Sequence, residues 1–127
     1  MMRVCFMLAA LCGVALAGSD SGIAGEWEGE YICTGVRAAC VDEHVIWTFK
    51  DPDRDGHVSA STDKVVGGVR QNMGSGEFQF DAKTETMTWK IPLGIWKFTR
   101  KKDAMDGILT LNDGQVARNV SLKRVVR

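Results

Sequence analysis

Residues 51–62, DPDRDGHVSAST, have the composition of a calcium-binding loop. Aspartates at the first, third and fifth positions and a glycine at the sixth are where a helix-loop-helix calcium site places its first ligands and its sharp turn. The twelfth position, however, is Thr62, where such a loop has a bidentate glutamate, and the flanking residues alternate as strands do. We therefore favour a hairpin loop, in which Pro52 presets a turn and Asp55-Gly56 tolerates a positive φ. The calcium site remains the alternative.

A second polar cluster, Asp42, Glu43 and His44, could supply an acid and a base for catalysis. Neighbours along a strand point to opposite faces, so Glu43 and His44 do not readily serve one site. We expect an ordinary polar rim and no enzymatic activity. His44 and His57 flank the same loop and could hold a transition metal together with the loop aspartates. That site is the minority interpretation, and we expect neither a metal nor a cofactor.

Aromatic residues give the strongest indication of a binding function. Many of them fall on the inward face of the strands that the sequence predicts, Phe80 and Phe98 among them. An eight-stranded barrel has an interior just large enough either to be filled by side chains or to hold one small ligand. Both outcomes remain open: a packed core, or a pocket for a small apolar ligand. The candidate ligand-binding residues are Tyr31, Trp47, Phe49, Phe78, Trp89 and Trp96.

The strands themselves are predicted by a period of two that dominates from Glu26 to Arg124. Turn signals such as DPDRDG, GSG and NDGQ separate the alternating runs. Eight or nine short strands at this spacing predict an all-β fold, a single antiparallel up-and-down barrel of about eight strands over residues 25–127. We prefer a barrel to a sandwich because closure removes the exposed edges of a long meander.

The first residues are those of a cleavable secretory signal. A basic Arg3 precedes an apolar run that ends in small residues, so we expect residues 1–17 to be removed after Ala17. A lipid anchor on Cys12 is the minority alternative. Residues 18–24 are expected to form a flexible leader. The apolar run is too short to span a bilayer comfortably, so the mature protein is expected to be secreted or periplasmic, without a membrane span.

Two cysteines, Cys33 and Cys40, remain after signal removal. In an oxidising compartment such a pair predicts a disulfide, here around a short loop, while free thiols or half of a zinc site form the alternative.

Charge is balanced overall but not along the chain, since the first half is acidic and the second half is basic. The two halves could form opposite faces, or they could cancel if the first and last strands are neighbours. A formal net charge of zero argues against a nucleic-acid partner, because no domain-wide basic field is present to neutralise phosphates. We expect a monomer.

The segment Gly25-Glu26-Trp27 resembles the G-x-W signature of the lipocalins and their calycin relatives. The resemblance implies an eight-stranded barrel that binds small apolar molecules, with the tryptophan at its base and an arginine of the last strand packed across it. We assign that arginine to Arg118, because a tryptophan face offers an inward guanidinium a cation–π contact. Trp27 and Arg118 are therefore the structural candidates.

The end of the chain, GILTLNDGQVARNVSLKR, also resembles small exported lipocalin-like bacterial proteins without assigned function. A second resemblance, to periplasmic lysozyme inhibitors, lies in EYICTG and GSGEFQF. The first resemblance implies a carrier of a small apolar ligand. The second implies a protein-interaction module that acts through loops and rim.

Overall fold

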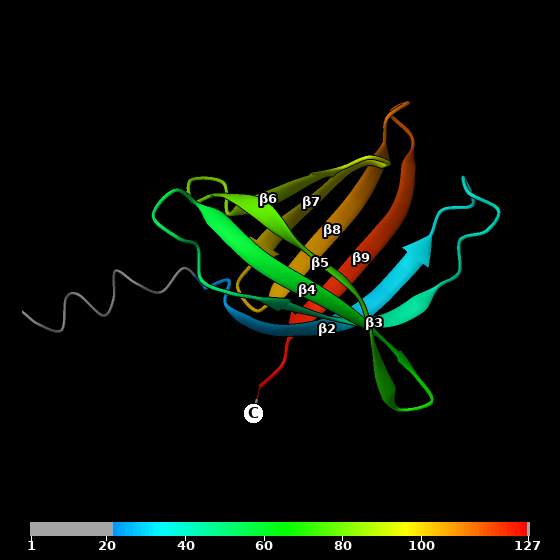
Figure 1. Ribbon diagram of the computed structural model, residues 1–127, viewed down its shortest axis with the longest axis horizontal. Helices are drawn as coiled ribbons and strands as arrows, with labels where there is room; N and C mark the ends of the chain where they lie inside the picture. The colour runs from blue at the N-terminus through cyan, green and yellow to red at the C-terminus, as the bar shows by residue number, and fades with distance from the viewer. Residues whose placement is uncertain (1–21, 127) are drawn as a thin grey trace, which may run out of the picture.

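This computed structural model describes residues 22–126, which contain eight β-strands and their connections. Consecutive strands are antiparallel neighbours, and the last strand pairs with the first to close a barrel (Figure 1). The predicted all-β up-and-down barrel is thus confirmed. The strands are β2 (Gly25–Cys33), β3 (Glu43–Phe49), β4 (His57–Val66), β5 (Val69–Asp81), β6 (Thr86–Ile91), β7 (Gly94–Lys101), β8 (Ala104–Leu111) and β9 (Val116–Arg124).

The apolar and polar residues that alternate along each strand form the inner and outer faces of the barrel. In β7, Trp96 and Phe98 are buried, whereas their strand neighbours Ile95 and Lys97 are exposed. Successive side chains of a strand point to opposite faces, so every strand contributes alternate residues to one core. Among residues 22–126, no helix has the length and apolar character needed to cross a membrane.

The strand directions define two ends of the barrel, which we call the base and the mouth. The base, on the left in Figure 1, carries the N-terminal segment and the turns at 50–56, 82–85 and 102–103. The mouth, on the right, carries the connections at 34–42, 67–68, 92–93 and 112–115.

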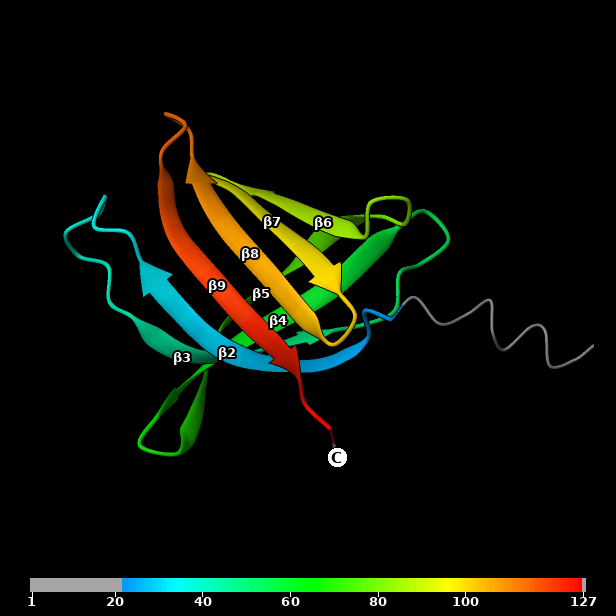
Figure 2. The same cartoon turned by 180° about the vertical axis from the view of Figure 1, so that it is seen from behind.

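Barrel closure places the acidic first strand beside the basic last strand, as the back view in Figure 2 shows. Glu28 of β2 pairs directly with Lys123 of β9. Opposite charges at facing strand positions attract each other. The uneven charge of the two chain halves therefore cancels locally across the closing seam.

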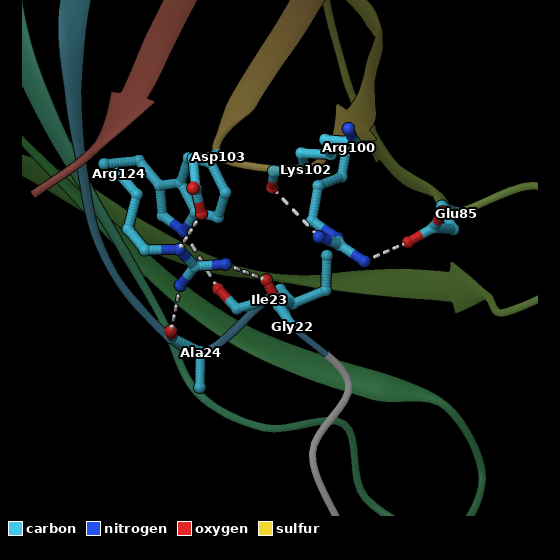
Figure 3. A network of polar contacts seen from close by, with 9 residues as sticks. Gly22, Ile23, Ala24, Glu85, Arg100, Lys102, Asp103 and Arg124 are labelled. Carbon is cyan, nitrogen blue, oxygen red and sulfur yellow. Dashed lines mark hydrogen bonds and ion pairs between the residues drawn. The ribbon is translucent and has the colours of Figure 1, made fainter.

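The base is closed by Trp27 and its neighbours. Its indole Nε1 donates a hydrogen bond of 2.9 Å to the carbonyl oxygen of Ile23. The guanidinium of Arg124 stacks 4.3 Å from the Trp27 ring centroid. Figure 3 shows Arg124 reaching three further groups, the carbonyl oxygens of Gly22 and Ala24 and the carboxylate of Asp103.

The predicted contact of Arg118 with Trp27 is wrong. Trp27 lies near the start of β2, at the base, and β9 runs antiparallel to it. Trp27 therefore faces Arg124 at the end of β9, while Arg118 pairs with Cys33 near the mouth. Both arginines lie at the same alternate positions of β9, so the period of two could not distinguish them.

The predicted flexible leader ends earlier than expected. Residues 22–24 pack against the base, with Ile23 fully buried and Gly22 beside Arg100. Arg100 is itself held by the carboxylate of Glu85 and by the carbonyl oxygen of Lys102 (Figure 3). Burial of an isoleucine side chain offsets the entropy lost on ordering this segment. The expected signal, residues 1–17, and residues 18–21 lie outside the described residues.

The predicted disulfide between Cys33 and Cys40 is present. It closes the connection between β2 and β3 at the mouth, where Asp42 also accepts a 2.8 Å hydrogen bond from the backbone N–H of Cys33. A disulfide is compatible with a secreted protein.

The hairpin of β4 and β5 extends beyond the barrel wall at the mouth, at the lower right of Figure 1. A bulge between Thr62 and Asp63 marks the point where it leaves the wall. Beyond it, the guanidinium of Arg70 joins the carboxylates of Asp63 (2.9 Å) and Glu26 (3.0 Å). These ion pairs orient the hairpin relative to β2.

Candidate ligand-binding site

The middle of the barrel is filled by stacked and edge-on rings. Trp47 contacts the rings of Phe49, Phe78 and Phe98, with centroids 5.0 to 5.8 Å apart. Such arrangements are favourable for aromatic pairs. Phe49 and Phe78, two of the predicted ligand-binding residues, are therefore core residues that line no cavity among those described.

Above this ring cluster a cavity of about 300 Å³ opens at the mouth. We call it the mouth cavity. Four of the six predicted ligand-binding residues line it, together with residues that the sequence did not single out for binding. The lining residues are Tyr31, Trp47, Thr62, Met73, Gly74, Ser75, Trp89, Ile91, Trp96 and Arg118.

The cavity exists because β5 and β6 separate toward the mouth. These strands pair over only three positions, from Gln79↔Thr88 to Asp81↔Thr86 near the base. The Trp89 indole lies against Gly76, where a Cβ atom would come within 2.2 Å of its Cζ2. A glycine at this position thus allows a large ring to sit between the diverging strands.

Two buried polar atoms in the cavity lining form no hydrogen bond of normal geometry within the described residues: Nε1 of Trp47 and Oγ1 of Thr62. Both side chains do lie near enough to the Tyr31 hydroxyl to lower its pKa, against the larger effect of burial. The two residues are only 1% and 8% exposed. An unsatisfied buried donor costs about 1–3 kcal/mol, so such atoms in a native protein call for an explanation. A ligand with an oxygen acceptor would satisfy them.

Thr62 was missed as a site residue, although its position was predictable. The run Val58, Ala60, Thr62 alternates within β4, and all three are buried. That alternation puts Thr62 on the inner face. The calcium-loop pattern assigns Thr62 only a position in a loop and says nothing of this burial.

Arg118 stands at the entrance of the cavity. Its Cζ atom lies 4.8 Å from the centroid of the Tyr31 ring, and its Nη1 lies 3.7 Å from the Glu43 carboxylate. Lys64 approaches the same carboxylate at 3.8 Å. Two cations therefore share one anion at this side of the mouth. Burial raises the pKa of Tyr31 to about 12, so its phenol stays protonated at neutral pH.

The three candidates for acid–base chemistry, Asp42, Glu43 and His44, do not converge on one site. Asp42 caps the backbone N–H of Cys33, and Glu43 faces Arg118 and Lys64. His44 lies on the outer wall. Each candidate is thus engaged with a different partner.

On that outer wall the His44 ring is held between two carboxylates of β2. Its Nδ1 contacts Glu30, and its Nε2 lies 2.5 Å from Glu28. Hydrogen bonding to Glu30, and then to Glu28, raises the pKa of His44 above its usual value. The imidazolium is therefore favoured in the folded state.

A raised histidine pKa makes stability depend on pH. The stabilisation by His44 is fully present below the pKa of the unfolded chain, about 6.5, and disappears as pH rises through the higher pKa of the folded state. We expect His44→Gln to reduce this loss of stability, measured by urea unfolding from pH 5.5 to 9. His57→Gln, in the base turn, is the control and should retain it. Equal pH profiles for His44→Gln and wild type would contradict this assignment.

The two histidines cannot share a metal, because His44 lies at the mouth end of β3 and His57 at the base. The loop before His57 is the predicted hairpin turn. The Asp53 carboxylate accepts hydrogen bonds from the backbone N–H groups of Asp55 (2.8 Å) and His57 (2.9 Å), and the bond from His57 contributes most to lowering its pKa.

The same turn brings together the one group of residues, among those described, that could bind a cation. Carboxylate and imidazole atoms of Asp53, Asp55 and His57 lie within 4.8 Å of one another. Thr62, the twelfth position of the calcium template, points instead into the barrel as part of β4. The turn's own hydrogen bonds account for the grouping.

Compared with known proteins, the chain matches no protein-family profile and no curated protein.

Proposed function

We propose that the protein is a non-catalytic binding protein that holds a small apolar ligand in the mouth cavity. The observation that carries this proposal is the cavity itself, about 300 Å³ in volume and lined by Tyr31, Trp47, Trp89 and Trp96. Small-molecule sites are concave and mostly apolar, with a few well-placed polar groups. Trp47 and Thr62 supply such groups.

We also propose that the protein is exported and related to the lipocalins. The Cys33–Cys40 disulfide and the signal-like first residues support export. The closed eight-stranded barrel, with Trp27 at its base and Arg124 across its ring, supports the relationship.

A fluorescence titration tests the binding proposal. The neutral apolar dye N-phenyl-1-naphthylamine should bind the purified protein and become brighter as it leaves water. Ile91→Trp, which adds bulk to the lining, should weaken this binding at least about tenfold, equivalent to 1.4 kcal/mol. Ile108→Trp adds the same ring at an exposed position and is the matched control. Dye binding that Ile91→Trp leaves intact would place the ligand elsewhere.

The protruding hairpin favours a second candidate function, a protein-interaction module such as a lysozyme inhibitor. Val66 and Val69 near its tip are 53% and 59% exposed. Exposed apolar groups on an oriented projection suit insertion into a partner's cleft. If this function is correct, the protein should inhibit lysis of a cell-wall suspension by lysozyme. The double variant Val66→Ser/Val69→Ser should lose inhibition, whereas Val126→Ser should keep it.

A further inference from the structure

Every polar side chain that lines the mouth cavity can donate a hydrogen bond. Arg118 and the Trp47 indole can only donate, while the hydroxyls of Tyr31, Thr62 and Ser75 can donate or accept. No aspartate or glutamate is among the lining residues. A ligand that contacts Arg118 and the Trp47 indole must therefore bring acceptors.

The charge at the entrance has the sign that complements an anion. Arg118 and Lys64 share the single carboxylate of Glu43, which leaves this group of three with one positive charge in excess. The Arg118 contact with Glu43 is long, at 3.7 Å. Within the described residues its guanidinium has no hydrogen bond of normal length to a carboxylate, so it retains donors for another partner.

A neighbouring cleft adds a second guanidinium to the same rim. Arg37 and Arg118 line this small hollow of about 90 Å³ beside the disulfide. Arg118 therefore lies between an apolar cavity on one side and a cationic rim on the other. That placement suits an amphipathic molecule with an apolar body and an anionic head.

We infer that the ligand of the mouth cavity is a small apolar or aromatic carboxylate. Arg118 neutralises its charge, the donors Trp47 Nε1 and Thr62 Oγ1 bind its oxygen acceptors, and Trp89, Trp96 and Ile91 enclose its apolar body. Guanidinium groups suit carboxylates because their N–H groups form a planar fork. This inference rests on the proposed function and adds to it the chemical class of the ligand.

Calorimetric titration with two matched probes tests the inference. The probes are 2-naphthoate and 2-naphthalenemethanol, which share the naphthalene ring and differ in the charge of their polar group. Naphthoate is expected to bind about 10- to 100-fold more tightly, the range expected for hydrogen bonds to a charged group. Arg118→Gln should remove this difference. Arg54→Gln, at an exposed position of the base turn, is the control for net charge and should preserve it.

A measurement on the unaltered protein makes the test independent of any folding defect in a variant. In protein labelled with ¹⁵N, the indole N–H resonance of Trp47 should shift when naphthoate is added, because Nε1 acquires an acceptor. Thr62→Val keeps the side-chain shape and should weaken naphthoate binding about 3- to 10-fold.

The outcomes separate the inference from the proposed function. Equal affinity for the two probes, or tighter binding of the alcohol, would overturn the carboxylate assignment and leave an apolar binding site standing. A charge preference that survives Arg118→Gln would also overturn it. If neither naphthalene probe nor the neutral dye binds, the proposed function itself fails.

Discussion

Replacing Trp27 by alanine is expected to lower the free energy of unfolding by about 3–5 kcal/mol, the usual cost of deleting a fully buried aromatic side chain. The ring is completely inaccessible to solvent. Its removal also deprives the carbonyl oxygen of Ile23 of a donor and the Arg124 guanidinium of the surface on which it stacks. Because a typical domain is stable by only about 5–15 kcal/mol, the variant should be marginal. Urea unfolding followed by far-UV circular dichroism measures the difference.

Trp89→Ala is the matched control for Trp27→Ala. This second tryptophan is half-buried, lines the mouth cavity and packs on Phe78 with ring centroids 5.5 Å apart. Its removal enlarges an existing opening and exposes little new core, so its cost should be clearly smaller. Trp27→Phe should cost less than Trp27→Ala, since a phenyl ring still fills much of the space although the hydrogen bond to Ile23 is lost. Equal losses for the two alanine variants would contradict the role of Trp27 as the closure of the base.

Gly29→Ala is expected to destabilise the barrel by about 3 kcal/mol or more, above the usual 1–3 kcal/mol for overpacking, because backbone atoms must move. A Cβ atom at this position of β2 would lie 1.7 Å from the carbonyl oxygen of Ser121 in β9. These two strands form the pair that closes the barrel. The seam must therefore open locally, and hydrogen exchange should be faster in β2 and β9 than in β4.

Gly76→Ala is the comparison for Gly29→Ala, because its added Cβ atom meets a side chain and not the backbone. Its Cβ atom would also clash, at 2.2 Å, but with the side chain of Trp89. A half-buried ring can rotate away, so this variant should lose less stability than Gly29→Ala and should change binding in the mouth cavity instead. If both variants are equally unstable, the distinction between backbone and side-chain clashes does not hold here.

Much of the architecture could be predicted from local pattern. Alternation identified the strands and the inward face, and turn residues such as Asp55 and Gly56 marked the connections. The prediction also placed Tyr31, Trp47, Trp89 and Trp96 inside the barrel, and these residues do line the cavity. Phe49 and Phe78 have the same inward pattern but lie deeper, in the filled part. The alternating pattern indicates which face of the sheet a side chain occupies, but it does not indicate how far along the barrel axis the side chain lies.

The two arginines of β9 also show that alternation does not give the position of a side chain along the barrel axis. Arg118 and Arg124 share a face, and only the antiparallel register with β2 decides that the second reaches Trp27. A simple geometric rule could have found it, since a residue at the start of the first strand must meet the end of the last one. The assignment of Arg118 to the mouth then follows, and with it the donor-rich character of the cavity.

The sequence by itself determined the all-β class, the turn at 51–56 and, once the expected signal is set aside, the pairing of Cys33 with Cys40. Each depends on neighbouring residues or, for the cysteines, on the one possible partner within residues 22–126. The tertiary structure alone decided the separation of β5 and β6, the burial of Ile23 and the placement of the Trp47 and Thr62 polar atoms without a hydrogen bond of normal geometry. These features arise from contacts between residues far apart in the chain. Their geometry depends on how the closed barrel distributes space, which no local pattern encodes.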